Sequence, residues 1–109
     1  MAEVLEIKDS AELEKQIADG GVTAVDFWAS WCGPCTALAP VVGRLAEAYG
    51  GKVLFCKVNV DGQRALAEKY GIRSIPCVIL FNHGAEAERL VGLKTETVYK
   101  TALERLLAP

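Results

Sequence analysis

The sequence predicts a single α/β domain in which mostly parallel strands are joined by helices. Two observations support this prediction: apolar runs typical of strands alternate with amphipathic runs of helical period, and the alternation ends in a hairpin signal and a last helix. The 109 residues, 51% of them hydrophobic, suit one domain with one ordinary core. We see no repeat, linker or low-complexity segment, so we expect one domain over residues 1–109.

Strands and helices are expected in alternation along the chain. The expected strands are residues 4–8, 22–29, 53–60, 78–81 and a fifth that follows the turn Asn82-His83-Gly84 and ends near residues 91–92. The expected helices run from a cap at Asp9 or Ser10 to about residue 19, from about 34 to 49, from a cap at Asp61 to 70, and from a cap at Thr95 onward.

Apolar residues at helical spacing define the core face of the three longer helices. They are Leu13 and Ile17 in the first, Leu38, Val41, Val42, Leu45 and Tyr49 in the second, and Val98, Ala102, Leu103, Leu106 and Leu107 in the last. The strands at 22–29 and 53–60 are apolar almost throughout, as expected for strands that are covered on both faces. Pro40 removes one helical hydrogen bond, so we expect a kink there.

Composition and charge disfavour several classes of protein. The net charge is -2, the pI is about 5.4 and no basic block occurs, so nucleic acid is not an expected partner. Residues 1–10 show neither the basic start nor the continuous apolar run of a secretory leader, and no apolar run approaches the ~20 residues that span a bilayer. We therefore expect a soluble, cytoplasmic protein with no membrane partner, in a compartment that keeps thiols reduced.

Two cysteines three residues apart lie at the expected junction between the second strand and the second helix, in Trp31-Cys32-Gly33-Pro34-Cys35. At a helix N-terminus the Cys32 sulfur meets unpaired N–H groups and the positive end of the helix dipole, which favour the nucleophilic thiolate. Cys35 follows one turn later on the same side, Pro34 suits a first helical turn, and Gly33 leaves room for a partner's backbone. A Cys32–Cys35 disulfide closes almost no loop and should be easily reversed. The segment predicts a thiol–disulfide switch.

Metal binding is the alternative for a chain with four cysteines. Zinc sites usually combine two closely spaced pairs of ligands, whereas Cys56 and Cys77 each stand alone in the sequence. We therefore expect no metal site.

The sequence closely resembles the thioredoxin family across essentially its whole length. The matching residues are Asp26-Phe27-Trp28-Ala29, Trp31-Cys32-Gly33-Pro34-Cys35, Ala39-Pro40, Lys57-Val58-Asn59-Val60-Asp61, Tyr70-Gly71-Ile72-Arg73-Ser74-Ile75-Pro76, Phe81, Gly84 and Gly92. The resemblance implies a five-stranded mixed sheet flanked by four helices. It also implies a monomeric reductant of oxidised protein substrates that binds no cofactor and is re-reduced by an NADPH-dependent flavoprotein, thioredoxin reductase.

The resemblance assigns roles to the two cysteines and to a buried acid. Cys32, at the exposed end of the helix, is expected to attack the substrate disulfide, and Cys35, deeper in, to resolve the mixed disulfide. Asp26 lies in an otherwise apolar strand, on the same face as Trp28, where burial should raise its pKa. By analogy it takes the proton of Cys35 through a water; an ion pair with Lys57 is the alternative, and both can hold. Lys57 is expected to tune Asp26.

The family places a cis peptide bond before Pro76, facing the disulfide, so that the Ile75 backbone can pair with an extended substrate segment. The residues alone also allow an ordinary proline at the start of a strand. We expect a flat, mostly apolar contact patch around Cys32, made of Trp31, Gly33, Pro34, Ile75, Val91 and Gly92. Trp28 is expected to be mainly structural, and His83 to be a solvated turn residue.

Three positions depart from the usual family pattern. Thr36 replaces a basic residue, which should slightly reduce stabilisation of the thiolate and change which partners dock. Cys77 stands where threonine is usual, and is either a small buried side chain or a third thiol near the active site. Cys56 is expected in the core.

Three functions compete. The first is a dithiol reductase of protein disulfides. The second is an oxidase or isomerase on the same fold, against which the Gly33-Pro34 pair argues, because oxidising members usually carry a histidine between the cysteines. The third is a binding module that presents the patch to a partner, for which both cysteines would be unnecessary.

Overall fold

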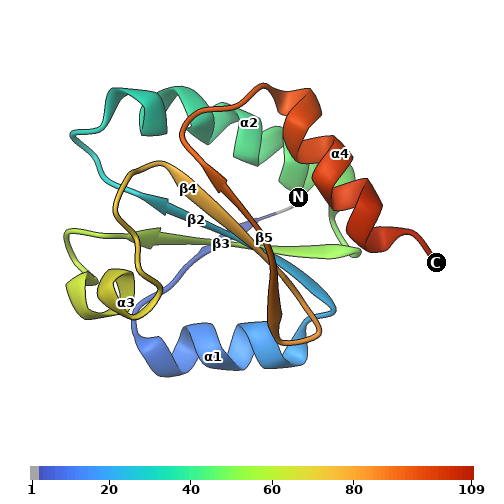
Figure 1. Ribbon diagram of the computed structural model, residues 1–109, viewed down its shortest axis with the longest axis horizontal. Coiled ribbons are helices and arrows are strands. Elements are labelled where there is room, and N and C mark those ends of the chain that lie inside the picture. The colour runs from blue at the N-terminus through green and yellow to red at the C-terminus, as the bar shows by residue number, and fades with distance from the viewer. Residues whose placement is uncertain (1–2) are drawn as a thin grey trace.

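The computed structural model describes residues 3–109, and over this range the chain forms a five-stranded sheet flanked by four helices (Figure 1). Met1 and Ala2 lie outside the described residues. They begin the segment of residues 1–10 in which the sequence shows no features of a secretory leader. The strands are β1 (Val4–Glu6), β2 (Val22–Trp28), β3 (Val53–Asn59), β4 (Cys77–Asn82) and β5 (Ala85–Val91). The helices are α1 (Ser10–Asp19), α2 (Gly33–Tyr49), α3 (Arg64–Lys69) and α4 (Glu96–Leu107).

The sheet is mixed, and β2 lies at its centre, in the order β1-β3-β2-β4-β5. Strands β1 and β2 both run parallel to β3, because α1 and α2 carry the chain back between them. Strand β4 runs antiparallel to β2, and β5 returns along β4 from the turn at residues 82–84. This confirms the expected mixed sheet with an antiparallel hairpin at one edge.

The two faces of the sheet are covered by different pairs of helices, with α2 and α4 on one side and α1 and α3 on the other (Figure 1). Side chains alternate between these faces along each central strand, so that β2 sends Ala24 to the α2 side and Val25 and Phe27 to the α1 side. Every residue of β2 from Val22 to Phe27 is buried, which explains why the strand is apolar almost throughout. Thr23 and Asp26 are the polar residues in that run, and Asp26 faces the α2 side.

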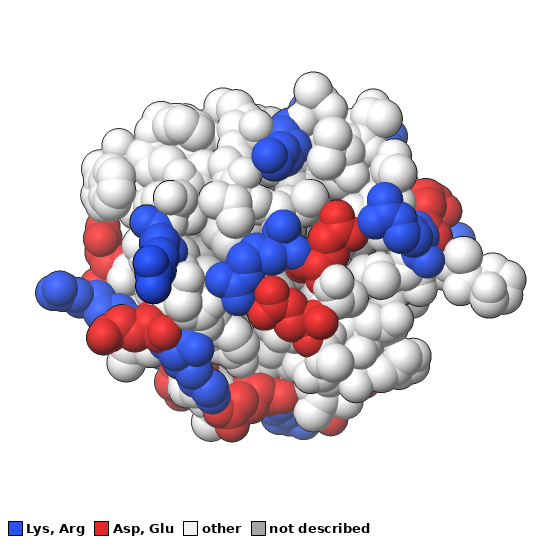
Figure 2. All heavy atoms as spheres, in the orientation of Figure 1, with Lys and Arg blue, Asp and Glu red and all other residues white. Residues whose placement is uncertain are grey.

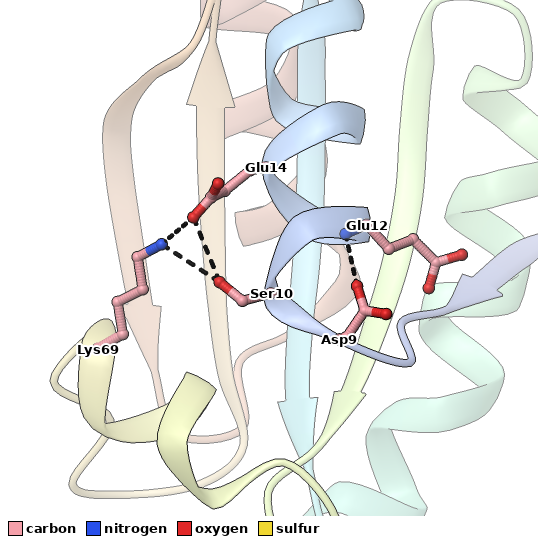
Figure 3. Close-up of polar contacts among 5 residues, drawn as sticks. All are labelled: Asp9, Ser10, Glu12, Glu14 and Lys69. Carbon is pink, nitrogen blue, oxygen red and sulfur yellow. Dashed lines mark hydrogen bonds and ion pairs between the residues drawn. The ribbon is translucent and has the colours of Figure 1, made fainter.

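Helix α1 begins as expected and is tied to α3 by polar contacts (Figure 3). The Asp9 carboxylate caps the helix by accepting the N–H of Glu12 at 2.8 Å. Lys69 of α3 donates to the Glu14 carboxylate and, at 3.3 Å, to the Ser10 hydroxyl. Because exposed pairs of this kind contribute about 0–1 kcal/mol, the burial of the apolar face of α1 carries most of its stability.

One expected helix start is wrong, and one expected capping residue makes no capping hydrogen bond. Helix α3 begins at Arg64 with Gln63 at its N-cap, so Asp61 does not cap it. The Asp61 carboxylate instead accepts a hydrogen bond from the Trp31 side chain. Thr95 does occupy the N-cap of α4, but its side chain makes no capping hydrogen bond.

The core face of α4 also differs from the expected one. Val98 is 40% exposed, whereas Tyr99, which the spacing argument passed over, is 2% exposed and packs in the core with Ala102 and Leu103. Val98 and Tyr99 each have apolar residues three or four positions away in α4. The face that packs against the core is the one that carries Tyr99, the larger side chain. Helix α2 continues through Pro40, as its apolar pattern indicated, and its expected kink stays a prediction.

Two glycines test how far local backbone geometry sets stability. Gly43 lies inside α2, and a Cβ built on it meets nothing within 4 Å. We expect Gly43→Ala to raise the free energy of unfolding by about 0.5–1 kcal/mol, because alanine loses less conformational entropy in a helix. Gly51 is equally open but has φ +86°, so Gly51→Ala should lower the free energy of unfolding by about 1 kcal/mol or more. Urea denaturation of both variants checks this, and equal effects at the two sites would contradict it.

Candidate active site

The dithiol lies where the helix expected after β2 begins. Cys32 is the N-cap of α2, and its sulfur accepts the N–H of Cys35 at 3.2 Å. Cys32 and Cys35 form a disulfide, with their Cα atoms 5.2 Å apart. The amide that points at the Cys32 sulfur here also stabilises a thiolate on that atom once the bond is reduced.

The two cysteines differ in surroundings more than in exposure. Cys32 is 5% exposed and Cys35 is 3% exposed, so Cys32 is more covered than its place at the exposed end of the helix suggested. The Cys32 sulfur lies 3.8 Å from the carbonyl oxygen of Ile75, in the loop before β4. Cys35 instead lines a pocket beside α2 together with Asp26 and Trp28. Cys32 therefore faces the loop at which a substrate would bind, and Cys35 faces the buried acid.

Asp26 is 7% exposed, and no residue from 3 to 109 offers a hydrogen-bond partner to its Oδ1. Burial raises the pKa of this carboxyl from 3.8 to about 7, although the positive charge of Lys57 acts in the opposite direction. The pocket that it shares with Cys35 measures about 230 Å³, more than a water molecule needs. Asp26 can therefore exchange a proton with Cys35 through solvent held between them.

Lys57 sits opposite Asp26 in the register of β2 and β3, but the expected direct ion pair is absent among the described residues. Its Nζ lies 5.7 Å from the centre of the Trp28 ring, a cation–π distance. The ammonium group acts on Asp26 across the pocket, where it offsets part of the cost of burying the charge. Lys57 can therefore lower the pKa of Asp26, as expected, without a direct ion pair between the two side chains.

The peptide bond between Ile75 and Pro76 is cis, as the resemblance implied. Pro76 is buried, and its carbonyl oxygen accepts the N–H of Gly92 at 2.8 Å. Ile75 is half-buried and packs against Ala29, Cys32 and Cys35. The cis-proline loop and the end of β5 are thereby held together beside the disulfide.

The residues of the expected contact patch lie in three segments around Cys32. Trp31 is 69% exposed and Val91 is 46% exposed, and Gly33 and Pro34 are also exposed. Figure 2 shows charges of both signs over the central and lower parts of the face in view, whereas the region over the start of α2, at the upper left, is uncharged. An exposed apolar surface beside a reactive disulfide is typical of a docking site for other proteins.

Asp61 is the site residue that the sequence argument missed, because it was assigned to a helix cap. Its Oδ2 accepts the indole N–H of Trp31 at 2.8 Å and so fixes the most exposed side chain of the patch. A signal was present in the sequence: β2 and β3 are parallel, so the residues that follow them meet at one edge of the sheet.

The remaining cysteines, Cys56 and Cys77, are free and buried. Cys77 follows Pro76 but points to the α1 side of the sheet, where it packs in one cluster with Phe27 and Ile79 and is 2% exposed. Burial raises the pKa of Cys77, and it raises the pKa of Cys56, 1% exposed, to about 12. Both thiols are therefore held in the protonated form, which is the weaker nucleophile, and their burial favours the interpretation of Cys77 as a small core side chain over that of a third active-site thiol.

The other singled-out residues are placed as follows. Trp28 is half-buried against the active-site cluster, and Thr36 is exposed and also lines the Asp26 pocket. His83 is an exposed turn residue with φ 51°. Residues 3–109 contain no group of three or more His, Cys, Asp or Glu side chains that could hold a metal ion. No helix in this range is both long and apolar enough to cross a membrane.

Asp26 should make stability fall as the pH rises. Between the ordinary carboxyl pKa of 3.8 and the raised value of about 7, the unfolded chain has lost this proton while the folded chain keeps it, so unfolding is favoured increasingly across that window. Above it the fold carries a penalty of up to about 4 kcal/mol. We expect oxidised Asp26→Asn to gain stability over the unchanged protein by that order across the window. Urea denaturation over a pH series measures the gain, and a difference independent of pH would contradict it.

Comparisons with known proteins agree with this geometry. The chain is 40% identical to thioredoxin 1 of Nostoc sp., over 98% of its own length and 100% of that protein. It is 38% identical to an M-type, chloroplastic thioredoxin of Spinacia oleracea, again over 98% of its length, but it spans only 59% of that longer protein. A mutant thioredoxin from Halobacterium salinarum superposes with a TM-score of 0.92 at 38% identity, over 98% of this chain and 93% of that one. The family model described as thioredoxin matches residues 4–105, and the chain belongs to the thioredoxin family.

Proposed function

We propose that this protein reduces disulfide bonds of other proteins by dithiol exchange at Cys32 and Cys35. The observation that carries the proposal is the placement of the Cys32 sulfur. It accepts a helix N-terminal amide at 3.2 Å and faces the carbonyl oxygen of Ile75 at 3.8 Å. One side of the sulfur is thus arranged to stabilise a thiolate, and the other faces a loop that an extended peptide can reach.

The reaction proceeds in two exchanges. The Cys32 thiolate attacks one sulfur of the substrate disulfide, the substrate S–S bond breaks, and one substrate thiolate leaves and takes a proton from solvent. The Cys35 thiol then gives up its proton to Asp26 through the shared pocket and attacks the Cys32 sulfur. The mixed disulfide breaks, the second substrate sulfur leaves as a thiolate and takes a proton from solvent, and the Cys32–Cys35 disulfide remains. Two electrons have passed to the substrate.

The substrate is an extended segment of an oxidised protein. Ile75 precedes β4, which begins at Cys77, so its backbone lies outside the sheet ladder and is placed to pair with an added strand. Trp31, Pro34 and Val91 offer apolar contact on either side. With no basic residue at Thr36, docking here depends more on shape and apolar contact than on charge.

Further turnover requires a source of electrons and a reducing compartment. We propose that an NADPH-dependent thioredoxin reductase returns the Cys32–Cys35 disulfide to the dithiol, because each turnover leaves this pair oxidised. We also propose that it works as a monomer in the cytoplasm, where thiols are kept reduced. Consumption of NADPH with a purified reductase, light scattering and cell fractionation test these three points.

The two competing functions predict different measurements. An oxidase or isomerase needs a dithiol form that is stabilised strongly enough to make its disulfide a good oxidant. A pure binding module would keep its partner when both cysteines are replaced. The buried acid beside Cys35 favours the reductase, because it assists the step that releases the reduced substrate.

The direction of electron flow is tested by the equilibrium of the Cys32–Cys35 pair with glutathione. We expect the protein to stay oxidised unless glutathione is in large excess, which means a potential well below that of the glutathione pool. Fluorescence of Trp28 and Trp31, which flank the disulfide, reports the fraction reduced. A potential well above the pool would make the protein an oxidant and contradict the proposal.

The order of attack is tested by trapping. We expect Cys35→Ser, mixed with an oxidised protein, to accumulate a covalent complex through Cys32, because the resolving thiol is gone. Cys32→Ser should form none, since the Cys35 sulfur faces the inner pocket. Cys77→Ser is the matched control and should exchange like the unchanged protein. Mass spectrometry identifies the linked cysteine, and a complex through Cys35 or Cys77 would reverse the assignment.

A further inference from the structure

We propose that Tyr99 is a positioning residue for substrate docking: its hydroxyl holds the loop from Gly92 to Lys94 in the shape that the substrate protein meets. This inference rests on the proposed function and names a residue that determines how well the same site binds. Tyr99 touches neither the disulfide nor the expected path of the substrate, so it acts through the loop.

The contacts of Tyr99 join the first turns of α4 to both ends of this loop. The hydroxyl donates to the carbonyl oxygen of Gly92 at 3.4 Å and accepts the N–H of Lys94 at 3.2 Å. The side chain is 2% exposed, and its ring packs in the core cluster that also holds Leu90 and Leu103. A ring fixed on one side by the core thus presents one hydroxyl that serves as donor and acceptor for two backbone groups.

The loop needs such a support because it lies between β5 and α4 and belongs to neither. Gly92 has φ +86°, a left-handed conformation, and its N–H donates to the Pro76 carbonyl at 2.8 Å. Its own carbonyl is the group that Tyr99 holds. Gly92 is therefore fixed from the cis-proline loop on one side and from α4 on the other.

The side chains on either side of Gly92 show what the fixed loop presents. Val91 is 46% exposed and Leu93 is 47% exposed, although both are large and apolar. Exposed apolar side chains next to the cis-proline loop extend the docking patch, and they bind a partner better when their backbone is already ordered, because less entropy is lost on binding. Burial raises the pKa of Tyr99, so the hydroxyl keeps the proton that it donates to Gly92.

A second tyrosine provides a matched control. Tyr49, at the end of α2, is also buried, and its hydroxyl donates to Glu104 of α4 at 2.8 Å. Tyr49→Phe and Tyr99→Phe therefore each remove one hydrogen-bonded hydroxyl that contacts or belongs to α4 and keep the ring. Of the two tyrosines, only Tyr99 makes hydrogen bonds to the loop from Gly92 to Lys94. A difference in substrate binding between the two variants therefore reports on the loop and not on general stability.

The experiment mixes pre-reduced protein with excess insulin, or with a small aromatic disulfide, and follows tryptophan fluorescence. The rate against insulin concentration separates half-saturation from the limiting rate, and no reductase is needed. We expect Tyr99→Phe to raise the half-saturation concentration for insulin about two- to tenfold, the range that one lost hydrogen bond of ordinary strength implies. The limiting rate, the rate with the small disulfide and the redox potential should be unchanged, and Tyr49→Phe should match the unchanged protein throughout.

Two results would overturn the inference. In the first, Tyr99→Phe has the same half-saturation concentration as Tyr49→Phe. In the second, it slows the small disulfide as much as insulin, which would place the effect at the sulfurs. If the unchanged protein reduces neither disulfide, the proposed function fails and the docking role falls with it. Amide hydrogen exchange then distinguishes a failure of the proposed function from a failure of the loop contact. If residues 92–94 exchange faster in Tyr99→Phe but not in Tyr49→Phe, the Tyr99 hydroxyl does hold the loop.

Discussion

The hydrogen bond from the Cys35 amide to the Cys32 sulfur is the contact on which the site depends. It exists because α2 starts directly after β2 at the centre of the sheet, so the helix N-terminus opens at the edge where β2 and β3 both end. The same edge receives the cis-proline loop from β4, which runs antiparallel to β2. The sheet order thus brings an electropositive helix end and the cis-proline loop to the same sulfur.

Burial of Asp26 lowers the stability of the fold. A carboxyl on the central strand, 93% removed from solvent and lacking a partner for Oδ1 within the described chain, opposes folding once it is charged. The fold tolerates it because β2 is buried between two layers of helices that supply the rest of the core. The opposing charge of Lys57 reaches Asp26 only across a pocket, so the pKa stays near neutrality. A direct ion pair would have lowered that pKa further, below the range in which the proposed proton transfer from Cys35 needs it.

The parts of the structure that depend on local pattern could be predicted from the sequence. Runs of apolar residues indicated the central strands, and the position of Cys32 before Pro34 indicated a helix start, because both depend only on neighbours in the chain. Asp61 and Tyr99 could not be placed in this way. Asp61 follows β3 with all the marks of a helix cap, and only the parallel register shows that Trp31 competes for its carboxylate. Val98 and Tyr99 both fit a helical stripe, and packing against the sheet decides between them.

Polar contacts hold two of the segments that carry the expected contact patch. Asp61 holds the indole of Trp31, Pro76 holds the amide of Gly92, and Tyr99 holds the backbone on both sides of Leu93. Trp31, Val91 and Leu93 face solvent at a high exposed fraction, whereas Ile75 is half-buried against the disulfide. Under the proposed function this surface binds many extended segments, so it cannot be shaped to one of them. Order in the backbone, with the side chains left open, lets such a surface bind different segments without the entropy loss of arranging itself for each one.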